Sequence, residues 1–213
     1  SVVVLMWGVQ EPAERQRSAT RINPFQKAQF QRLTVNYWWI VTLGALLMLA
    51  RFSEAFLVLK AHDLGLAAMW IPLVLVGMNA VYSLVAYPVG VLSDRLGGRG
   101  LLLASVCVLA LGDVILALDL GAMGLAAGVA LWGLHMGMSQ GILATWVANS
   151  APGELRGTAF GVFNLISGLA LLIASVVAGA VWDIWGSSAT FALGGIFCVI
   201  WGMVFVKVRS KII

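Results

Sequence analysis

The chain has 213 residues, of which 61% are hydrophobic and only 10% are charged, and its formal net charge is +4. Soluble domains carry roughly 25% charged residues, so this composition excludes an ordinary water-exposed surface and indicates a membrane protein. The basic residues lie in turns and tails, where membrane topology accounts for them, so the positive charge does not predict a nucleic-acid partner.

Six apolar stretches follow one another along the chain, and each is about long enough for a membrane-spanning helix. A helix needs about 20 residues to cross roughly 30 Å of hydrocarbon. The stretches are continuous rather than alternating, which argues against the strands of an outer-membrane barrel. The predicted fold class is therefore all-α, a polytopic membrane bundle of six transmembrane helices within residues 36–206. The predicted spans are roughly Asn36 to Lys60, Met69 to Leu92, Gly100 to Leu118, Ala122 to Ala148, Gly157 to Trp182 and Ser188 to Val206.

The segments outside the bundle have different characters. Residues 1–9 are apolar over only about 12 Å of helix, which is too short to cross a bilayer, and we interpret them as the end of a preceding transmembrane helix. Residues 10–35 are polar and basic and are predicted to form a linker, and residues 207–213 a short tail. The chain is therefore expected to be the second half of a larger protein.

The basic residues are distributed unevenly between the two sides of the predicted bundle. Threading the six spans alternately across a bilayer leaves only Lys60 near the turns of one side, which otherwise hold His62, Asp63, Asp119 and Asp183. The other side receives Arg15, Arg17, Arg21, Lys27, Arg32, Arg95, Arg99, Arg156, Lys207, Arg209 and Lys211. By the positive-inside rule, the linker and the C-terminus are predicted to be cytoplasmic, in a cell inner membrane or plasma membrane.

The first span contains two ionisable residues, Arg51 and Glu54. Charges inside a membrane are expensive, so both need an explanation. Three residues apart on one helix, they lie on neighbouring parts of one face and can neutralise each other. One interpretation is a structural ion pair that makes insertion tolerable. The other is functional, with Arg51 meeting an anionic solute and Glu54 exchanging a proton.

Further polar side chains interrupt the second, fourth and fifth spans. They are candidates for a substrate or proton pathway, although such residues often only bond another helix. The set consists of Asn79, Tyr82, His135, Gln140 and Asn164. Asp113 is about six residues from the outer end of its span, so we expect it to reach the interface and rank it below Glu54.

A glycine ridge in the fourth span predicts close helix packing. Gly133, Gly137 and Gly141 recur every four residues, which allows a second backbone to approach closely. Cys107 and Cys198 lie inside apolar spans and are expected to pack as small hydrophobes. No metal site, cofactor site or enzyme motif is predicted.

The turn after the second span carries the most specific motif of the chain. It reads Gly90-Val91-Leu92-Ser93-Asp94-Arg95-Leu96-Gly97-Gly98-Arg99, in which Gly90, Asp94, Arg95, Gly97 and Arg99 fit the pattern Gly-x-x-x-Asp-Arg-x-Gly-x-Arg. This resembles the cytoplasmic signature loop of the major facilitator superfamily. Independently of the name, Asp94 can accept hydrogen bonds from a neighbouring helix N-terminus and so act as a gating latch. The alternative is that these charges only fix topology.

The resemblance implies that the chain is the C-terminal six-helix half of a twelve-helix secondary transporter. The family's loop occurs between helices two and three and again between helices eight and nine, and the present one fits the second place. A small solute would then bind between this half and a missing N-terminal half during alternating access. Proton coupling is one option. The alternative function is a non-transporting membrane sensor or scaffold; an enzyme is not expected, since no catalytic triad recurs on facing spans.

Overall fold

A computed structural model describes residues 32–208 of the chain, and within this part all regular structure is helical. The expected apolar end of a helix at residues 1–9, most of the linker and the last basic residues, Arg209 and Lys211, lie outside the described part. The helices are α3 (Val35–Ala50), α4 (Ala55–Asp63), α5 (Pro72–Leu96), α6 (Gly98–Ala117), α7 (Gly121–Ser150), the single 3-10 turn η1 (Gly153–Leu155) and α8 (Arg156–Val208).

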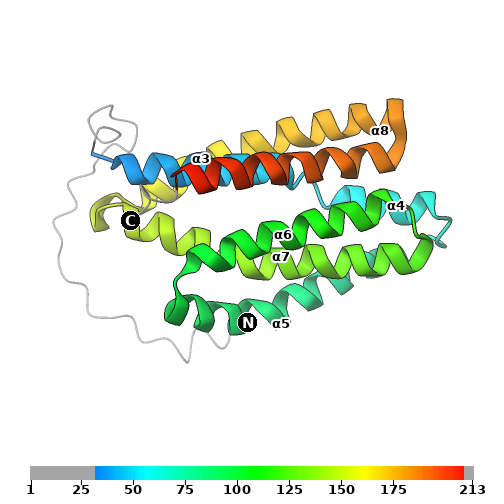
Figure 1. Cartoon of the computed structure of the whole chain (residues 1–213), viewed down its shortest axis with the longest axis horizontal. Helices are drawn as coiled ribbons and strands as arrows, with labels where there is room; N and C mark the ends of the chain where they lie inside the picture. Colours follow the sequence, from blue (N-terminus) through cyan, green and yellow to red (C-terminus); the bar gives the residue numbers. More distant parts are fainter. Residues whose placement is uncertain (1–31, 209–213) are drawn as a thin grey trace, which may run out of the picture.

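The helices form an elongated bundle in which they run roughly parallel to one long axis (Figure 1). Helix α3 packs on α8, α5 on α7, and α6 on both α7 and α8. The buried Trp201 donates from Nε1 to the carbonyl oxygen of Leu43 at 2.8 Å, and Tyr37 donates from its hydroxyl to that of Ala159 at 2.9 Å. These two hydrogen bonds fix α3 against α8 through side chains whose polar ends need a buried partner.

Five helical segments are long and apolar enough to cross a membrane, not the six that the sequence predicts. The predicted spans from Met69, Gly100 and Ala122 correspond to α5, α6 and α7 within a few residues. The difference lies at the end of the chain, where the predicted fifth and sixth spans form the single helix α8. The count differs because these two spans follow each other without a loop and are separated by one non-helical residue, Gly186.

Helix α8 nevertheless reverses its direction at one residue. Its 53 residues would reach about 80 Å as a straight rod, more than twice the thickness of the hydrocarbon layer. Gly186 leaves the helical conformation with φ 81° and ψ 179°, values that a glycine adopts at little cost. The two arms lie side by side in Figure 1, and Thr190 on the second arm donates to the carbonyl oxygen of Ala178 on the first at 3.3 Å.

The first predicted span, Asn36 to Lys60, is also not continuous. Helix α3 ends at Ala50 and α4 begins at Ala55, so Arg51, Phe52, Ser53 and Glu54 lie in a break between them. The Ser53 hydroxyl accepts a hydrogen bond from the N–H of Ala55 at 3.2 Å. Serine competes in this way for helical backbone groups, which a count of apolar residues does not detect.

The turns collect at the two ends of the bundle. In Figure 1 the start of α3, the turn between α5 and α6 and the start of α8 lie at one end, and the turn between α6 and α7 and the reversal of α8 lie at the other. Among the described residues, Arg95, Arg99 and Arg156 belong to the first end and Asp119 to the second. The fold therefore keeps apart the two sets of charges that the sequence separates.

Candidate functional site

The break between α3 and α4 places a cation inside the bundle. The Arg51 N–H still donates to the carbonyl oxygen of Leu47 at 2.8 Å and closes α3, but its backbone is non-helical, with φ −105° and ψ 72°. The N–H of Ser53 donates to the hydroxyl of Ser175 on α8 at 3.2 Å. The break is thus held by side chains of its own segment and of α8, which satisfy backbone groups that no longer bond within a helix.

Arg51 and Glu54 lie close together, but not on one helix face as predicted. Their nearest charged atoms, Nη2 and Oε1, are 3.8 Å apart, and the side chains are 10% and 36% exposed. A contact of this length is an ion pair without a good hydrogen bond. Nε and Nη1 of Arg51 are buried and have no hydrogen-bond partner within the described residues. The guanidinium therefore retains unused donors.

Asp113 is a second intramembrane acid, and the prediction that it reaches the interface is wrong. Its side chain is 0% exposed, on α6. Oδ1 accepts a hydrogen bond from Nε1 of Trp132 on α7 at 2.9 Å, whereas Oδ2 has no partner among residues 32–208. The packing of α6 against α7 and α8 covers the residue, which its distance from the end of the span does not reveal. An acid within an apolar stretch was the signal available in the sequence.

His135 completes a set of buried polar side chains in the bundle. Its Nδ1 lies 2.8 Å from the carbonyl oxygen of Ser105 on α6. A carbonyl can only accept, so Nδ1 carries a proton, and in the neutral ring Nε2 is then an acceptor. Nε2 is buried without a partner in the described part of the chain. Arg51 lies within electrostatic range of His135. Arg51, Asp113 and His135 are together called the central cluster below, because each is buried and keeps a polar side-chain atom without a partner among the described residues.

Other predicted pathway residues lie away from this cluster. Asn79, Gln140 and Asn164 are exposed on α5, α7 and α8, and Tyr82 is half-buried on α5. The Asn79 amide donates to the carbonyl oxygen of Leu75 in its own helix at 2.8 Å. The structure therefore does not gather the predicted polar residues into one site. Instead it divides them between a buried set and an exposed set.

The glycine ridge of α7 meets α5 over part of its length. A Cβ atom at Gly133 would collide with the carbonyl oxygen of Met78, and one at Gly137 would lie 3.0 Å from that of Tyr82. Around Gly141 there is no atom within 4 Å of such a Cβ position. Two of the three glycines thus lie where the backbones approach closely, and the third faces open space.

The signature turn lies between α5 and α6. Gly97 has φ 79°, a conformation suited to glycine, and a Cβ atom at Gly98 would lie 2.6 Å from the Ile142 side chain on α7. Asp94 and Arg95 are exposed. A cavity of about 210 Å³ beside the turn is lined in part by Gly90, Asp94 and Gly141. The turn is therefore tight on its α7 side, and its acidic side chain remains accessible.

A second polar cluster, which the sequence did not predict, joins the opposite end of the bundle. Lys60 on α4 is 3% exposed, and its Nζ lies 2.7 Å from Oδ1 of Asp119 and 2.8 Å from the hydroxyl oxygen of Ser187. Asp119 follows α6, and Ser187 follows the reversal of α8. Lys60, Asp119 and Ser187 are called the outer cluster below. The sequence showed Lys60 only as an isolated basic residue.

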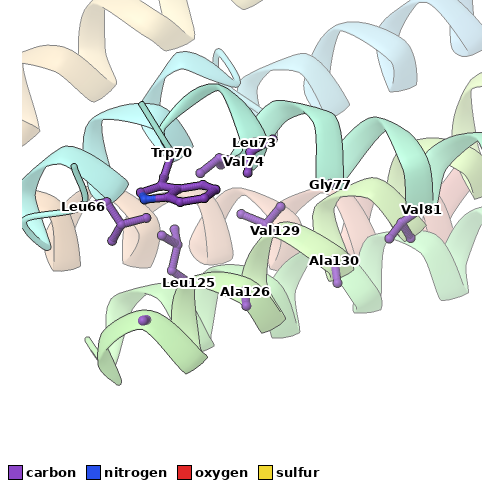
Figure 2. A pocket seen from close by; sticks show the side chains of 11 residues that line it. Leu66, Trp70, Leu73, Val74, Gly77, Val81, Leu125, Ala126, Val129 and Ala130 are labelled. Carbon is purple, nitrogen blue, oxygen red and sulfur yellow. The ribbon is translucent and has the colours of Figure 1, made fainter. Parts of the chain in front are cut away.

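The largest hollow that we describe is an apolar groove between α5 and α7, with a volume of about 410 Å³. Figure 2 shows Trp70 and α5 side chains on one wall and Leu125 and Val129 of α7 on the other. It has no charged lining residue, so it offers no partner for an ionic group. Within residues 32–208, no group of three or more His, Cys, Asp or Glu side chains could hold a metal ion.

Comparison with known proteins identifies the family to which the chain is similar. Residues 39–211 match the Major Facilitator Superfamily. An uncharacterized MFS-type transporter of Methanocaldococcus jannaschii is 28% identical over 169 residues, which cover 76% of this chain and 42% of the relative. A proton myo-inositol cotransporter of Caenorhabditis elegans is 28% identical over 104 residues, covering 49% of this chain and 17% of the relative.

The fold has a counterpart among solved structures. A crystal structure of a mutant of the peptide transporter POT with alafosfalin superimposes with a TM-score of 0.57 at 22% identity. The superposition covers 87% of this chain and 39% of the transporter. The chain thus spans less than half the length of each of these proteins. Because a family match extends over most of the chain, this multi-pass membrane protein belongs to the Major Facilitator Superfamily.

Proposed function

We propose that the chain is the C-terminal half of a secondary transporter that moves a small solute by alternating access. Two observations support the half: the chain matches 42% and 39% of two longer proteins, and the signature turn follows the second of its spans. Counting the two arms of α8 separately gives six crossings. The preceding half, whose last helix would end within residues 1–9, would complete the carrier.

The exposed amides mark the face that the missing half would cover. Asn79, Gln140 and Asn164 lie exposed within apolar helices, where contact with lipid would be unfavourable. A solute-filled cavity or a second bundle would solvate or pair them. We therefore place the solute path along this face, near the midplane of the membrane.

The observation that carries the proposal is the break at Arg51 to Glu54. Secondary transporters bind solutes at discontinuous helices, because broken helices present free backbone groups and charges at membrane depth. Arg51 has unused donors at Nε and Nη1, which suit a carboxylate, phosphate or sulfate group. Glu54 is partly exposed and would exchange a proton while Arg51 holds the anionic solute.

The signature turn would serve as the latch between the two halves. Asp94 is exposed at the end of α5 and could accept hydrogen bonds from a helix N-terminus of the missing half. The distribution of basic residues supports a cytoplasmic position for this end and for the C-terminus, in an inner or plasma membrane.

The test begins with a screen of carboxylate, phosphate and sulfate compounds for thermal stabilisation of the full-length protein. A compound that stabilises the wild type but not Arg51→Met is then labelled and followed by counterflow in proteoliposomes. Lys207→Met, at the cytoplasmic end, is the matched control for loss of a cation. Counterflow establishes transport, whereas stabilisation without any counterflow would favour a sensor or scaffold.

Coupling is tested with the same labelled compound. Glu54→Gln should abolish accumulation driven by a pH gradient and preserve exchange, because the amide keeps the shape but cannot titrate. The double variant Arg51→Met, Glu54→Gln should fold and show no uptake. Normal gradient-driven uptake by the double variant would contradict a functional role for the pair.

A further inference from the structure

Asp113 is a buried acid that the Arg51 and Glu54 pair does not explain. It lies on α6, whereas the pair lies in the break between α3 and α4. Its one hydrogen-bond donor is Nε1 of Trp132, bound to Oδ1 at 2.9 Å. Oδ2 is buried and has no donor in the part of the chain that the structure describes.

Among residues 32–208, no Lys, Arg or His side chain forms an ion pair with Asp113. Helix α7 carries Trp132, which binds Asp113, and His135, whose Nδ1–H donates to the carbonyl oxygen of Ser105. Helix α8 contributes the neutral Cys198 thiol, within electrostatic range of Asp113. In the break, the carboxylate paired with Arg51 is that of Glu54. On α5, Asp94 and Arg95 belong to the far end of the bundle, at the signature turn.

The space beside Oδ2 is apolar. A Cβ atom at Gly194 of α8 would lie 2.6 Å from Oδ2 and 3.1 Å from the ring of Phe52, so the carboxyl group and the ring both lie against this glycine. Phe52 also packs against Trp132, with ring centroids 5.5 Å apart. A hard metal cation requires several oxygen ligands, and no group of three or more His, Cys, Asp or Glu side chains within residues 32–208 could hold one. A proton requires only one oxygen.

We propose that Asp113 is a proton-binding site of the carrier, with the proton on Oδ2 in the conformation described here. An ionised carboxylate with one donor and no ion-pair partner would be costly in this position, and a proton removes the charge. On release, the O–H bond breaks, the proton passes to water, and the carboxylate keeps the Trp132 hydrogen bond. This site rests on the proposed transport function and adds a second titrating group to it.

The helix break gives the site its route to water. Phe52 lies on the same side of Gly194 as Oδ2 and belongs to the non-helical segment, next to Arg51. A movement of this segment would separate Phe52 from Trp132 and open the space beside the carboxyl group. Proton release would then depend on the same movement that admits or releases the solute at Arg51.

The proton itself is the probe in the first experiment. Infrared difference spectra of the full-length protein, recorded between low and high pH, should contain the carbonyl band of a buried carboxylic acid. The band should be absent from Asp113→Asn and present in Asp183→Asn, a matched change at an exposed acid beside the reversal of α8. A band that persists in Asp113→Asn would overturn the proposal.

Asparagine can accept from Trp132 and donate from its amide, so it imitates the protonated acid and should fold. If that variant yields no protein, Trp132→Phe in the full chain should shift the carbonyl band, since it removes the hydrogen bond to Oδ1. An unshifted band in Trp132→Phe would assign the signal to another acid and overturn the proposal.

Transport then separates this inference from the function on which it rests. Asp113→Asn should keep counterflow of the labelled compound and lose its pH-driven accumulation down to passive equilibration. Accumulation at the wild-type level would exclude Asp113 as a coupling site. Absence of counterflow in the wild type would instead contradict the transport function, and the infrared result would still decide whether Asp113 binds a proton.

Discussion

The outer cluster and the central cluster each contain a buried cation and an acid, but the two clusters differ in how completely their polar atoms are paired. In the outer cluster, Lys60 makes two short contacts, at 2.7 Å to Asp119 and 2.8 Å to Ser187. In the central cluster, Arg51 approaches Glu54 only to 3.8 Å, and Arg51, Asp113 and His135 each keep a buried atom without a partner. Satisfied groups fix a structure, whereas unsatisfied buried groups usually have another purpose.

The difference also follows the connectivity of the chain. The outer cluster joins α4, the turn after α6 and the reversal of α8, three segments distant in sequence that need a clamp. The central cluster lies where the first span is interrupted. We infer that the segments joined by the outer cluster stay fixed relative to one another. Conformational changes during the proposed transport would then be concentrated at the break between α3 and α4.

The largest expected effect comes from breaking the outer cluster. Asp119→Asn keeps a residue that tolerates φ 52° but leaves Lys60 buried without its counter-charge. We expect a loss of about 3 kcal/mol, at the low end for a broken buried pair because Asp119 is 54% exposed. Heat-induced unfolding of the purified protein measures it, with Asp183→Asn as control. An unchanged midpoint of thermal unfolding would show that the outer cluster does not stabilise the fold more than the central cluster does.

A smaller effect is expected when the centre is overpacked. Gly194→Ala places a methyl group against Oδ2 of Asp113 and the Phe52 ring, and should destabilise the protein by about 1–3 kcal/mol. Gly195→Ala is the matched control, since no atom lies within 4 Å of its Cβ position. Equal midpoints of thermal unfolding for the two variants would show that the space around Asp113 can accept a methyl group.

The smallest effect on stability should come from Glu54→Gln. The pair is long and Glu54 is 36% exposed, so its removal should cost less than about 1 kcal/mol, as for a surface pair. The same thermal measurement, beside Asp119→Asn, tests this ranking. A loss of several kcal/mol would assign the pair a structural role comparable to that of the outer cluster.

The sequence predicted the class of fold and most of its spans because hydrocarbon imposes a length and a composition on any helix that crosses it. It failed at the break after Ala50, which lies inside a span that was predicted as continuous, and it missed that the reversal between the spans ending at Trp182 and beginning at Ser188 takes a single residue, Gly186. Both are decided by one or two residues: Ser53 binds the backbone of Ala55, and Gly186 adopts a positive φ. Window-averaged hydrophobicity does not respond to such residues.

The sites were less predictable than the spans. Arg51, Glu54 and His135 were identified because a polar residue in an apolar span is conspicuous. Asp113 was underestimated because its burial depends on how α6 packs against α7 and α8. Lys60 was missed as a clamp, since its partners lie 59 and 127 positions further along the chain, as Asp119 and Ser187. Pairings of this kind require the fold.

The reversal at Gly186 has a consequence for how the protein enters its membrane. One residue joins the two arms of α8, so there is no loop that could be handled separately from the helices. The hydrogen bond that holds the reversal requires both arms, because Thr190 on the second arm donates to the carbonyl oxygen of Ala178 on the first. We therefore expect the two arms of α8 to enter the membrane together, as a helical hairpin.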